Sequence, residues 1–193
     1  MYKSIYLTGA PATGKSTILK ILSEESDKIK IFEYGKEMAK HLSLQNKSII
    51  EQSSMKGGIE SLVAQNDIDA IDKKMKIFID EHIGNYHTII DTHQITKEEY
   101  GFKLKTFSFE QLKELRIDEI WVLYCDSKTV QKRVRLNSEG RPIIEDYESD
   151  FHSYAQSHLA ILYSMIKDVP IYFFNSGDAS MSYKEIMLRN LNV

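Results

Sequence analysis

A glycine-rich segment near the start of the chain constrains the fold more than any other feature of the sequence. It reads Gly9-Ala10-Pro11-Ala12-Thr13-Gly14-Lys15-Ser16-Thr17, and it stands between the apolar run Ser4–Thr8 and an amphipathic run that begins at Lys15. A glycine, four free positions, a second glycine, a lysine and a serine or threonine are typical of a loop between a buried strand and a helix. The segment therefore predicts the strand–loop–helix unit that begins many α/β domains.

Each fixed position of this segment suits phosphate binding. Gly9 allows a tight turn at the end of the strand, and Gly14 lets the main chain approach phosphate oxygens because it has no Cβ. The loop amides and the N-terminus of the helix present partial positive charge. Lys15 would reach the β- and γ-phosphates, and the Ser16 hydroxyl would enter the Mg²⁺ shell. We therefore expect the whole segment Gly9–Thr17 to bind the polyphosphate of ATP together with Mg²⁺.

Beyond this segment, short apolar runs typical of strands alternate with amphipathic runs typical of helices. The further strands are expected at 29–34, 88–91, 119–124 and 170–174. Helices are expected at 15–26, 35–44, 59–83, 109–115, 127–136 and 183–191, and along the stripe Phe151, Tyr154, His158, Ile161, Leu162 and Met165. The mostly polar stretch 92–107 is expected to be a loop. This alternation predicts a three-layer α/β P-loop NTPase fold, with a central five-stranded parallel sheet covered by helices on both faces.

Length and composition predict a single domain. The chain has 193 residues, which we assign to one domain with a helical insertion at about 35–85 and a lid at about 137–150. Its net charge of −3 argues against a dedicated nucleic-acid binder, which usually has a basic face. No apolar run reaches the ~20 residues that span a bilayer. The single cysteine, Cys125, cannot form an internal disulfide, which favours a reducing, cytoplasmic location.

A phosphate-binding loop usually works with a carboxylate at the end of a neighbouring strand. Asp91 ends the apolar run Thr88-Ile89-Ile90 and is the best such residue in the chain. We expect Asp91 to bind Mg²⁺ together with Ser16 and to take part in catalysis. His93 follows two residues later, either as a contact to substrate phosphate or as an ordinary loop residue.

Arginines matter because phosphoryl transfer spreads charge over oxygens that a guanidinium group stabilises well. Arg133 and Arg135 lie about 200° apart on the expected helix at 127–136, so only one of them would face the nucleotide. Arg141 lies in the expected lid. We assign Arg133 to nucleotide binding, and Arg135 and Arg141 to catalysis with Lys15 and Asp91.

The base of the nucleotide is predicted from a second loop and from one missing motif. Asn175 begins the loop Asn175-Ser176-Gly177-Asp178 after the last expected strand, where it either contacts adenine or forms a plain turn. The sequence contains no Asn-Lys-x-Asp set of the kind that reads guanine. Adenine is therefore the favoured base.

With these residues placed, the chain resembles the archaeal-type adenylate kinases, a branch of the small P-loop nucleotide kinases. The resemblance rests on Thr8–Thr17, on Phe32-Glu33-Tyr34-Gly35 before a helix with Met38, on Ile89-Ile90-Asp91-Thr92-His93, and on Arg135-Leu136-Asn137 with the later Tyr163. It implies reversible transfer of the ATP γ-phosphate to a nucleoside monophosphate. It also implies that the insertion at 35–85 covers the monophosphate and that 137–150 closes over ATP.

The departures from this family concern the phosphoryl acceptor. No arginine occurs before Arg116, although the family places one in its monophosphate-binding segment, so Lys36, Lys40, Lys56 or Lys73 would have to substitute. The acceptor is then a nucleoside monophosphate, another small molecule or water. The alternative function is an ATPase of the same fold that acts on a protein or RNA partner. Its binding surface would include the aromatic residues Tyr100, Phe102, Phe107 and Phe109, which otherwise are core packing.

Overall fold

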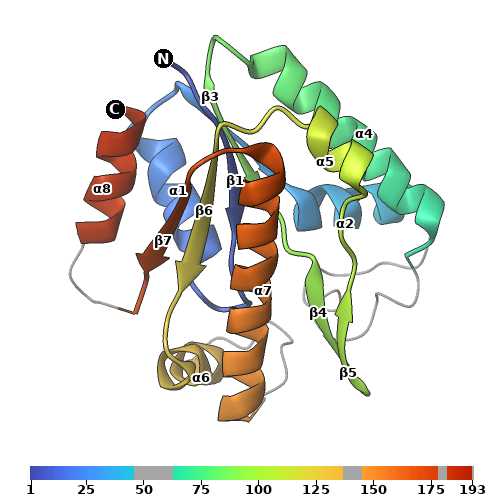
Figure 1. Cartoon of the computed structure of the whole chain (residues 1–193), viewed down its shortest axis with the longest axis vertical. Coiled ribbons are helices and arrows are strands. Elements are labelled where there is room, and N and C mark those ends of the chain that lie inside the picture. Colours follow the sequence, from blue (N-terminus) through green and yellow to red (C-terminus); the bar gives the residue numbers. More distant parts are fainter. Residues whose placement is uncertain (46–62, 137–144, 178–181, 193) are drawn as a thin grey trace.

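The computed structural model describes residues 1–45, 63–136, 145–177 and 182–192 of the chain. A sheet of five parallel strands forms its centre, in the order β2-β3-β1-β6-β7 (Figure 1). The strands are β1 (Ser4–Thr8), β2 (Ile29–Glu33), β3 (His87–Asp91), β6 (Glu119–Tyr124) and β7 (Ile171–Asn175). The predicted α/β P-loop NTPase fold is therefore confirmed, including the number and direction of the central strands.

Helices cover both faces of this sheet. They are α1 (Lys15–Glu25), α2 (Tyr34–Leu44), α4 (Gln65–His82), α5 (Phe109–Glu114), α6 (Ser127–Leu136), α7 (Asp146–Lys167) and α8 (Ser182–Leu191). In Figure 1, α7 lies in front of the sheet with α2, α4 and α5 to its right, while α1 and α8 lie to its left. Among the described residues, no helix is both long enough and apolar enough to span a bilayer.

Strand residues alternate between two hydrophobic cores because successive side chains of a strand point to opposite faces. Tyr6 and Ile120 belong to the core under α2, α4, α5 and α7. Leu7 and Trp121, their neighbours in the chain, belong to the core under α1 and α8. The middle residues of β1 and β6 are therefore apolar on both faces, because the sheet is buried on both sides.

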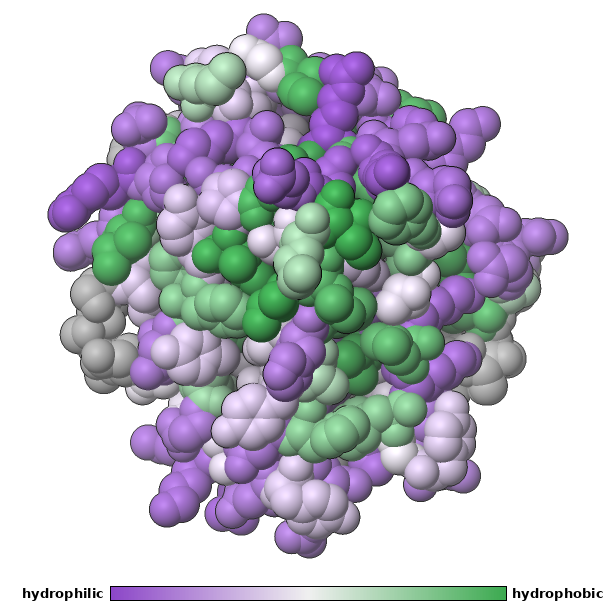
Figure 2. All heavy atoms as spheres, viewed as in Figure 1, coloured by the Kyte–Doolittle hydropathy of each residue, from purple (hydrophilic) through white to green (hydrophobic). Residues whose placement is uncertain are grey.

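The observed elements correspond to the predicted ones with two differences. The stretch 92–107, predicted as a loop, contains an antiparallel hairpin of β4 (Ile95–Glu98) and β5 (Gly101–Leu104). Helix α4 begins at Gln65 rather than 59, with 59–62 outside the described residues. The stripe that predicted a helix lies on the exposed side of α7. Apolar side chains gather near the centre of Figure 2, where α7 lies in the same view of Figure 1.

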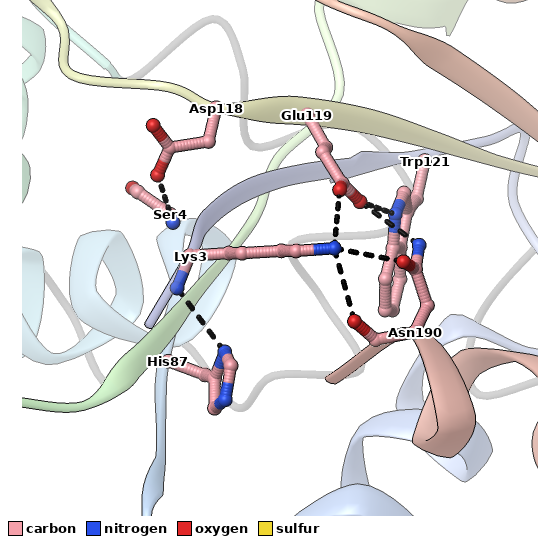
Figure 3. A network of polar contacts seen from close by, with 7 residues as sticks. All are labelled: Lys3, Ser4, His87, Asp118, Glu119, Trp121 and Asn190. Carbon is pink, nitrogen blue, oxygen red and sulfur yellow. Dashed lines mark hydrogen bonds and ion pairs between the residues drawn. The ribbon is translucent and has the colours of Figure 1, made fainter. Parts of the chain in front are cut away.

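A network of polar contacts ties α8 to the amino-terminal edge of the sheet (Figure 3). The Lys3 ammonium lies 2.6 Å from the Glu119 carboxylate and donates hydrogen bonds to Asn190 at 2.8 and 3.0 Å. Glu119 also accepts hydrogen bonds from the Trp121 indole at 2.9 Å and from the Asn190 amide at 3.0 Å. Because Glu119 is only 5% exposed, these contacts compensate the cost of a buried carboxylate.

We expect Lys3→Met to lower the free energy of unfolding by about 3 kcal/mol, because it leaves the buried Glu119 carboxylate without its cation. Urea denaturation followed by circular dichroism measures the loss. Lys20→Met is the matched control, because Lys20 and Glu24 form an exposed pair 3.8 Å apart that contributes little. Equal losses in the two variants would contradict the role assigned to Glu119.

Candidate functional site

The glycine-rich segment forms a compact loop between β1 and α1, at the carboxyl edge of the sheet. A Cβ atom at Gly9, whose φ is 151°, would lie 2.3 Å from the Leu123 carbonyl oxygen. Gly14 is the N-cap residue of α1 and has a left-handed conformation, with φ at 98°. The amide and hydroxyl of Thr13 both donate to the Ala10 carbonyl, at 3.4 and 2.7 Å. Both glycines are thus required by the conformation that presents the loop amides.

The Lys15 ammonium lies on this loop. It donates hydrogen bonds to the carbonyl oxygens of Gly9 at 2.7 Å and Ala10 at 3.3 Å. Ser16 and Thr17 follow in the first turn of α1 and are exposed. Phosphate oxygens carry full negative charge and form stronger hydrogen bonds with an ammonium group than neutral carbonyls do. The arrangement can therefore transfer Lys15 from the loop to a bound phosphate.

Asp91 ends β3, beside the strand that leads into the loop. Its neighbours in the sheet are Leu7 on β1 and Glu33 on β2. The Asp91 Oδ1 atom is buried and has no hydrogen-bond partner. Burial raises the pKa of the Asp91 carboxyl, while the nearby Lys15 ammonium opposes this rise and Glu33 adds to it. A buried carboxylate oxygen without a donor is a favourable ligand for a cation.

The chemistry of these groups fits Mg²⁺ bound together with a nucleotide. Within the described residues, no three His, Cys, Asp or Glu side chains gather into a cage that could hold a metal alone. Mg²⁺ usually takes one or two protein ligands and completes its shell with phosphate oxygens and water. Asp91 and the exposed Ser16 hydroxyl can supply such a partial shell, and their role as metal ligands stays a prediction.

Arg133 reaches from α6 to the phosphate-binding loop. Its guanidinium donates to the Ala12 carbonyl at 3.1 Å and to the Ser176 carbonyl at 2.6 Å. Arg135 is exposed, and its guanidinium donates to Gln131 on the same helix at 3.4 Å. The structure therefore brings Arg133 to the loop and leaves Arg135 outside this cluster, as their angular separation on a helix requires.

Ser176 is a contact of the loop that the sequence did not single out. Its hydroxyl donates to the Thr13 carbonyl and accepts from Arg133 at 3.3 Å. Its amide donates to the Tyr124 carbonyl at 2.8 Å, which joins the ends of β6 and β7. The neighbouring Asn175 side chain accepts from the Gly177 amide at 2.9 Å and so forms the turn. Only the spatial neighbourhood of these loops distinguishes Ser176 from the other serines.

Buried polar side chains line the α7 side of the same edge, and the sequence analysis missed them. Gln156 on α7 donates to the Thr8 hydroxyl at 2.8 Å, while its own amide oxygen has no partner. The Tyr6 hydroxyl donates to the Gln94 amide oxygen. Such side chains could hold a polar substrate beside Asp91. Their signal in the sequence is weak, because a buried glutamine on a helix has no distinctive spacing.

His152 lies one turn before Gln156 on the buried side of α7. Its Nε2 donates to the Ile95 carbonyl at 2.9 Å, which connects α7 to the hairpin. Burial lowers the pKa of His152 to about 4, although this hydrogen bond opposes the shift. The imidazole is therefore neutral at physiological pH and contributes no positive charge to the site.

Helices α2 and α4 contact each other through polar side chains, and α2 begins directly after Glu33, the sheet neighbour of Asp91. The Tyr34 hydroxyl donates to Asp72 at 2.8 Å, and His41 lies 3.2 Å from Asp67. Lys36 forms an ion pair with Glu33 at 2.5 Å. This helix pair corresponds to the described part of the predicted insertion at 35–85.

The other residues predicted for the acceptor site and the lid are exposed or lie outside the described residues. Lys40, Lys73 and His93 are exposed. Lys56 and Arg141 lie outside the described residues, as does most of the predicted lid. The roles proposed for Arg141 and for a lid at about 137–150 stay predictions.

The aromatic residues of the hairpin region divide into two groups. Phe102 packs on Phe151 with ring centroids 5.1 Å apart, and Phe107 packs on Tyr163 at 6.0 Å. Tyr100 and Phe109 are exposed by 77% and 52%. Local packing therefore explains the first pair and leaves only Tyr100 and Phe109 available to a partner.

The raised pKa of Asp91 has a consequence for stability. The folded chain holds this proton more tightly than the unfolded chain, so ionised Asp91 costs stability at neutral pH. We expect Asp91→Asn to raise the free energy of unfolding at neutral pH, without nucleotide or metal. The gain should fade as the pH falls through the raised pKa of Asp91, and it should be gone below the ordinary carboxyl pKa of about 4. Chemical denaturation across this pH range measures it.

Asp126→Asn is the matched control for this experiment. Hydrogen bonds from the Thr129 hydroxyl and amide lower the pKa of Asp126, so its ionised form stabilises the fold. We expect this second variant to lose stability at neutral pH. The assignment for Asp91 would be wrong if Asp91→Asn also lost stability there.

Comparison with solved structures shows the same fold in small kinases. The chain is similar to a sugar kinase from Janibacter sp. HTCC2649, with a TM-score of 0.55, 15% identity and 100% and 96% coverage of this chain and that one. It is also similar to shikimate kinase from Bacteroides thetaiotaomicron, with a TM-score of 0.61, 16% identity and 99% coverage of both chains. At these identities the likeness establishes the fold.

Comparison of sequences establishes the family. No curated protein matches the chain. A family model described as an AAA domain matches residues 8–150, from the end of β1 to the first turn of α7, and so includes the phosphate-binding loop and Asp91. Because this match covers most of the chain, the protein belongs to this AAA-domain family.

Proposed function

We propose that this protein is a small-molecule kinase that transfers the γ-phosphate of ATP and requires Mg²⁺. The observation that carries the proposal is the pairing of the phosphate-binding loop with Asp91. The positive charge of the nearby Lys15 lowers the pKa of the Asp91 carboxyl, which burial raises. The Asp91 Oδ1 atom has no hydrogen-bond partner. A cation bound between the two groups would be a ligand for Asp91, and the phosphates would accept hydrogen bonds from Lys15.

Each residue of the site has a distinct part in this proposal. The loop amides and Lys15 bind the phosphates, and Arg133 with Ser176 holds the loop in its conformation. Ser16 and Asp91 hold Mg²⁺, which neutralises charge on the phosphate oxygens. Arg135 and Arg141 would have to approach when 137–150 closes, and Asn175 would contact adenine.

The acceptor that we propose is a nucleoside monophosphate, as in the adenylate-type kinases that the chain resembles. The acceptor site would lie beside Glu33, Asp91 and the α2–α4 pair, because we assign the phosphate-binding loop and the ends of β6 and β7 to ATP. Lysines must then bind the monophosphate, since no arginine precedes Arg116 in the sequence. A lysine is a point charge that cannot bind phosphate in bidentate fashion.

The alternative is an ATPase of the same fold that acts on a protein or RNA. The exposed Tyr100 and Phe109 are the residues that favour it, because they could contact a partner beside the hairpin. For either activity we propose a cytoplasmic location, since Cys125 is a free, buried thiol and ATP is the donor.

An acceptor panel distinguishes these functions. Purified protein is incubated with ATP, Mg²⁺ and single acceptors, namely nucleoside monophosphates, nucleosides, and sugars or other hydroxylated metabolites. We expect a phosphorylated product with one class of acceptor and little free phosphate. Free phosphate at an equal rate with every acceptor would support the ATPase and contradict the kinase.

The same assay tests the site. We expect Lys15→Ala and Asp91→Ala to lower turnover about 10²–10³-fold, because each removes a charge that the transferred phosphate or its metal requires. Lys20→Ala on α1 and Asp80→Ala on α4 are the matched controls, since both residues are exposed and lie outside the segment Gly9–Thr17. Unchanged turnover in Lys15→Ala and Asp91→Ala would refute the assignment.

A further inference from the structure

Helix α7 exposes an apolar stripe along its whole length. Tyr154 is 66% exposed, Leu162 54% and Met165 72%. With these three, the stripe contains Tyr147, Phe151, Ile161 and Ile166, and also the exposed His158. These positions recur every three or four residues, so they lie on one side of the helix over roughly 28 Å. We call them the α7 stripe.

The α7 stripe is free of charge. The sequence contains no aspartate, glutamate, lysine or arginine between Phe151 and Ile166. The exposed side of α4, in contrast, carries Lys73, Lys74 and Lys76 within one turn. Charged residues are depleted at the centres of protein interfaces, whereas solvated helix faces usually contain them. The stripe therefore has the composition of an interface.

The apolar surface continues from α7 onto the edge of the sheet. Strand β7 ends the five-stranded sheet, and its residues Ile171–Asn175 are uncharged. Phe173 pairs with Val122, which faces the core under α7, so Phe173 is on the α7 side and is 44% exposed. Edges of sheets are usually protected by charges or proline. In Figure 2 apolar side chains gather on this face of the molecule.

The size of this surface matches what a stable dimer buries. The exposed fractions of Phe173 and the apolar members of the α7 stripe correspond to on the order of 900 Å², at about 200 Å² for each whole side chain. A specific interface buries about 800 Å² on each partner. The largest apolar patch on a monomer is typically about 300–600 Å².

We propose that the α7 stripe and Phe173 bind a second copy of this chain in a two-fold dimer. In a two-fold contact the same surface meets itself, so a charge near the axis would meet its own copy, and the stripe has no aspartate, glutamate, lysine or arginine between Phe151 and Ile166. In the arrangement that we propose, the axis is perpendicular to the stripe, so the two α7 helices run antiparallel. His158 lies halfway between Phe151 and Met165, so an axis that passes near His158 brings Phe151 of one copy into contact with Met165 of the other.

Sedimentation equilibrium of the full-length chain tests the dimer. We expect a mass of twice 22.4 kDa at high concentration, and a mass of 22.4 kDa for the double variant Leu162→Glu, Met165→Glu. Ile77→Glu on α4 and Ile186→Glu on α8 are matched controls, because these side chains are 45% and 50% exposed and lie off this surface. Both controls should stay dimeric, and circular dichroism verifies that every variant is folded.

Several results would overturn the proposal. These are a wild-type chain that stays at 22.4 kDa at all concentrations, a dimer that persists in the folded double variant, and a wild-type monomer that instead binds a different protein through this surface. None of these measurements involves nucleotide, so they are independent of the kinase assay.

A cross-link tests the antiparallel arrangement. We expect His158→Cys to form a disulfide-linked dimer on mild oxidation, because the two introduced sulfur atoms would face each other across the axis. Cys125 is buried, so the wild-type chain should give no such product. Lys20→Cys on α1 is the exposed control and should remain unlinked. If the His158→Cys variant is dimeric but forms no disulfide, the antiparallel arrangement is wrong.

Discussion

The close approach of Gly9 to the carbonyl oxygen of Leu123 is the constraint on which the site depends. β1 lies at the centre of the sheet between β3 and β6, so a chain that leaves β1 must turn against the end of β6. A Cβ atom at Gly9 would be 2.3 Å from that oxygen, which no side chain tolerates. The turn directs the loop amides into the space above the strands. The parallel register with β3 then brings Asp91 beside the same turn.

Local sequence and strand direction together predicted the parts of the structure that follow from this constraint. The motif Gly9–Thr17 specifies a loop because its glycines have conformations that other residues avoid. Asp91 could be placed because parallel strands all end at one edge of a sheet, and because an apolar run marks β3 as buried. The angular separation of Arg133 and Arg135 followed from helix geometry alone. Whether these residues act as predicted depends on the enzyme assays.

Features that depend on contacts distant in the sequence were missed. The hairpin at 95–104 consists of two short strands with few apolar residues, and it packs on α7 through contacts such as that of Phe102 with His152. Ser176 contacts Thr13 across more than 160 residues of sequence. The apolar stripe on α7 illustrates a different limit. Its spacing predicts a helix correctly, but periodicity does not distinguish a side that packs in the core from one that faces outward.

Each edge of the sheet contains a buried carboxylate, but only the carboxylate at the amino-terminal edge has a full set of partners. At the amino-terminal edge, Glu119 is fully compensated by Lys3, Trp121 and Asn190, so its carboxylate stabilises the packing of α8. At the carboxyl edge, Asp91 keeps a buried oxygen without a donor. An uncompensated carboxylate is far more costly than an unpaired hydroxyl. In the function that we propose, this cost is recovered when a cation and phosphates bind, so ligand binding and local stability would depend on the same atom.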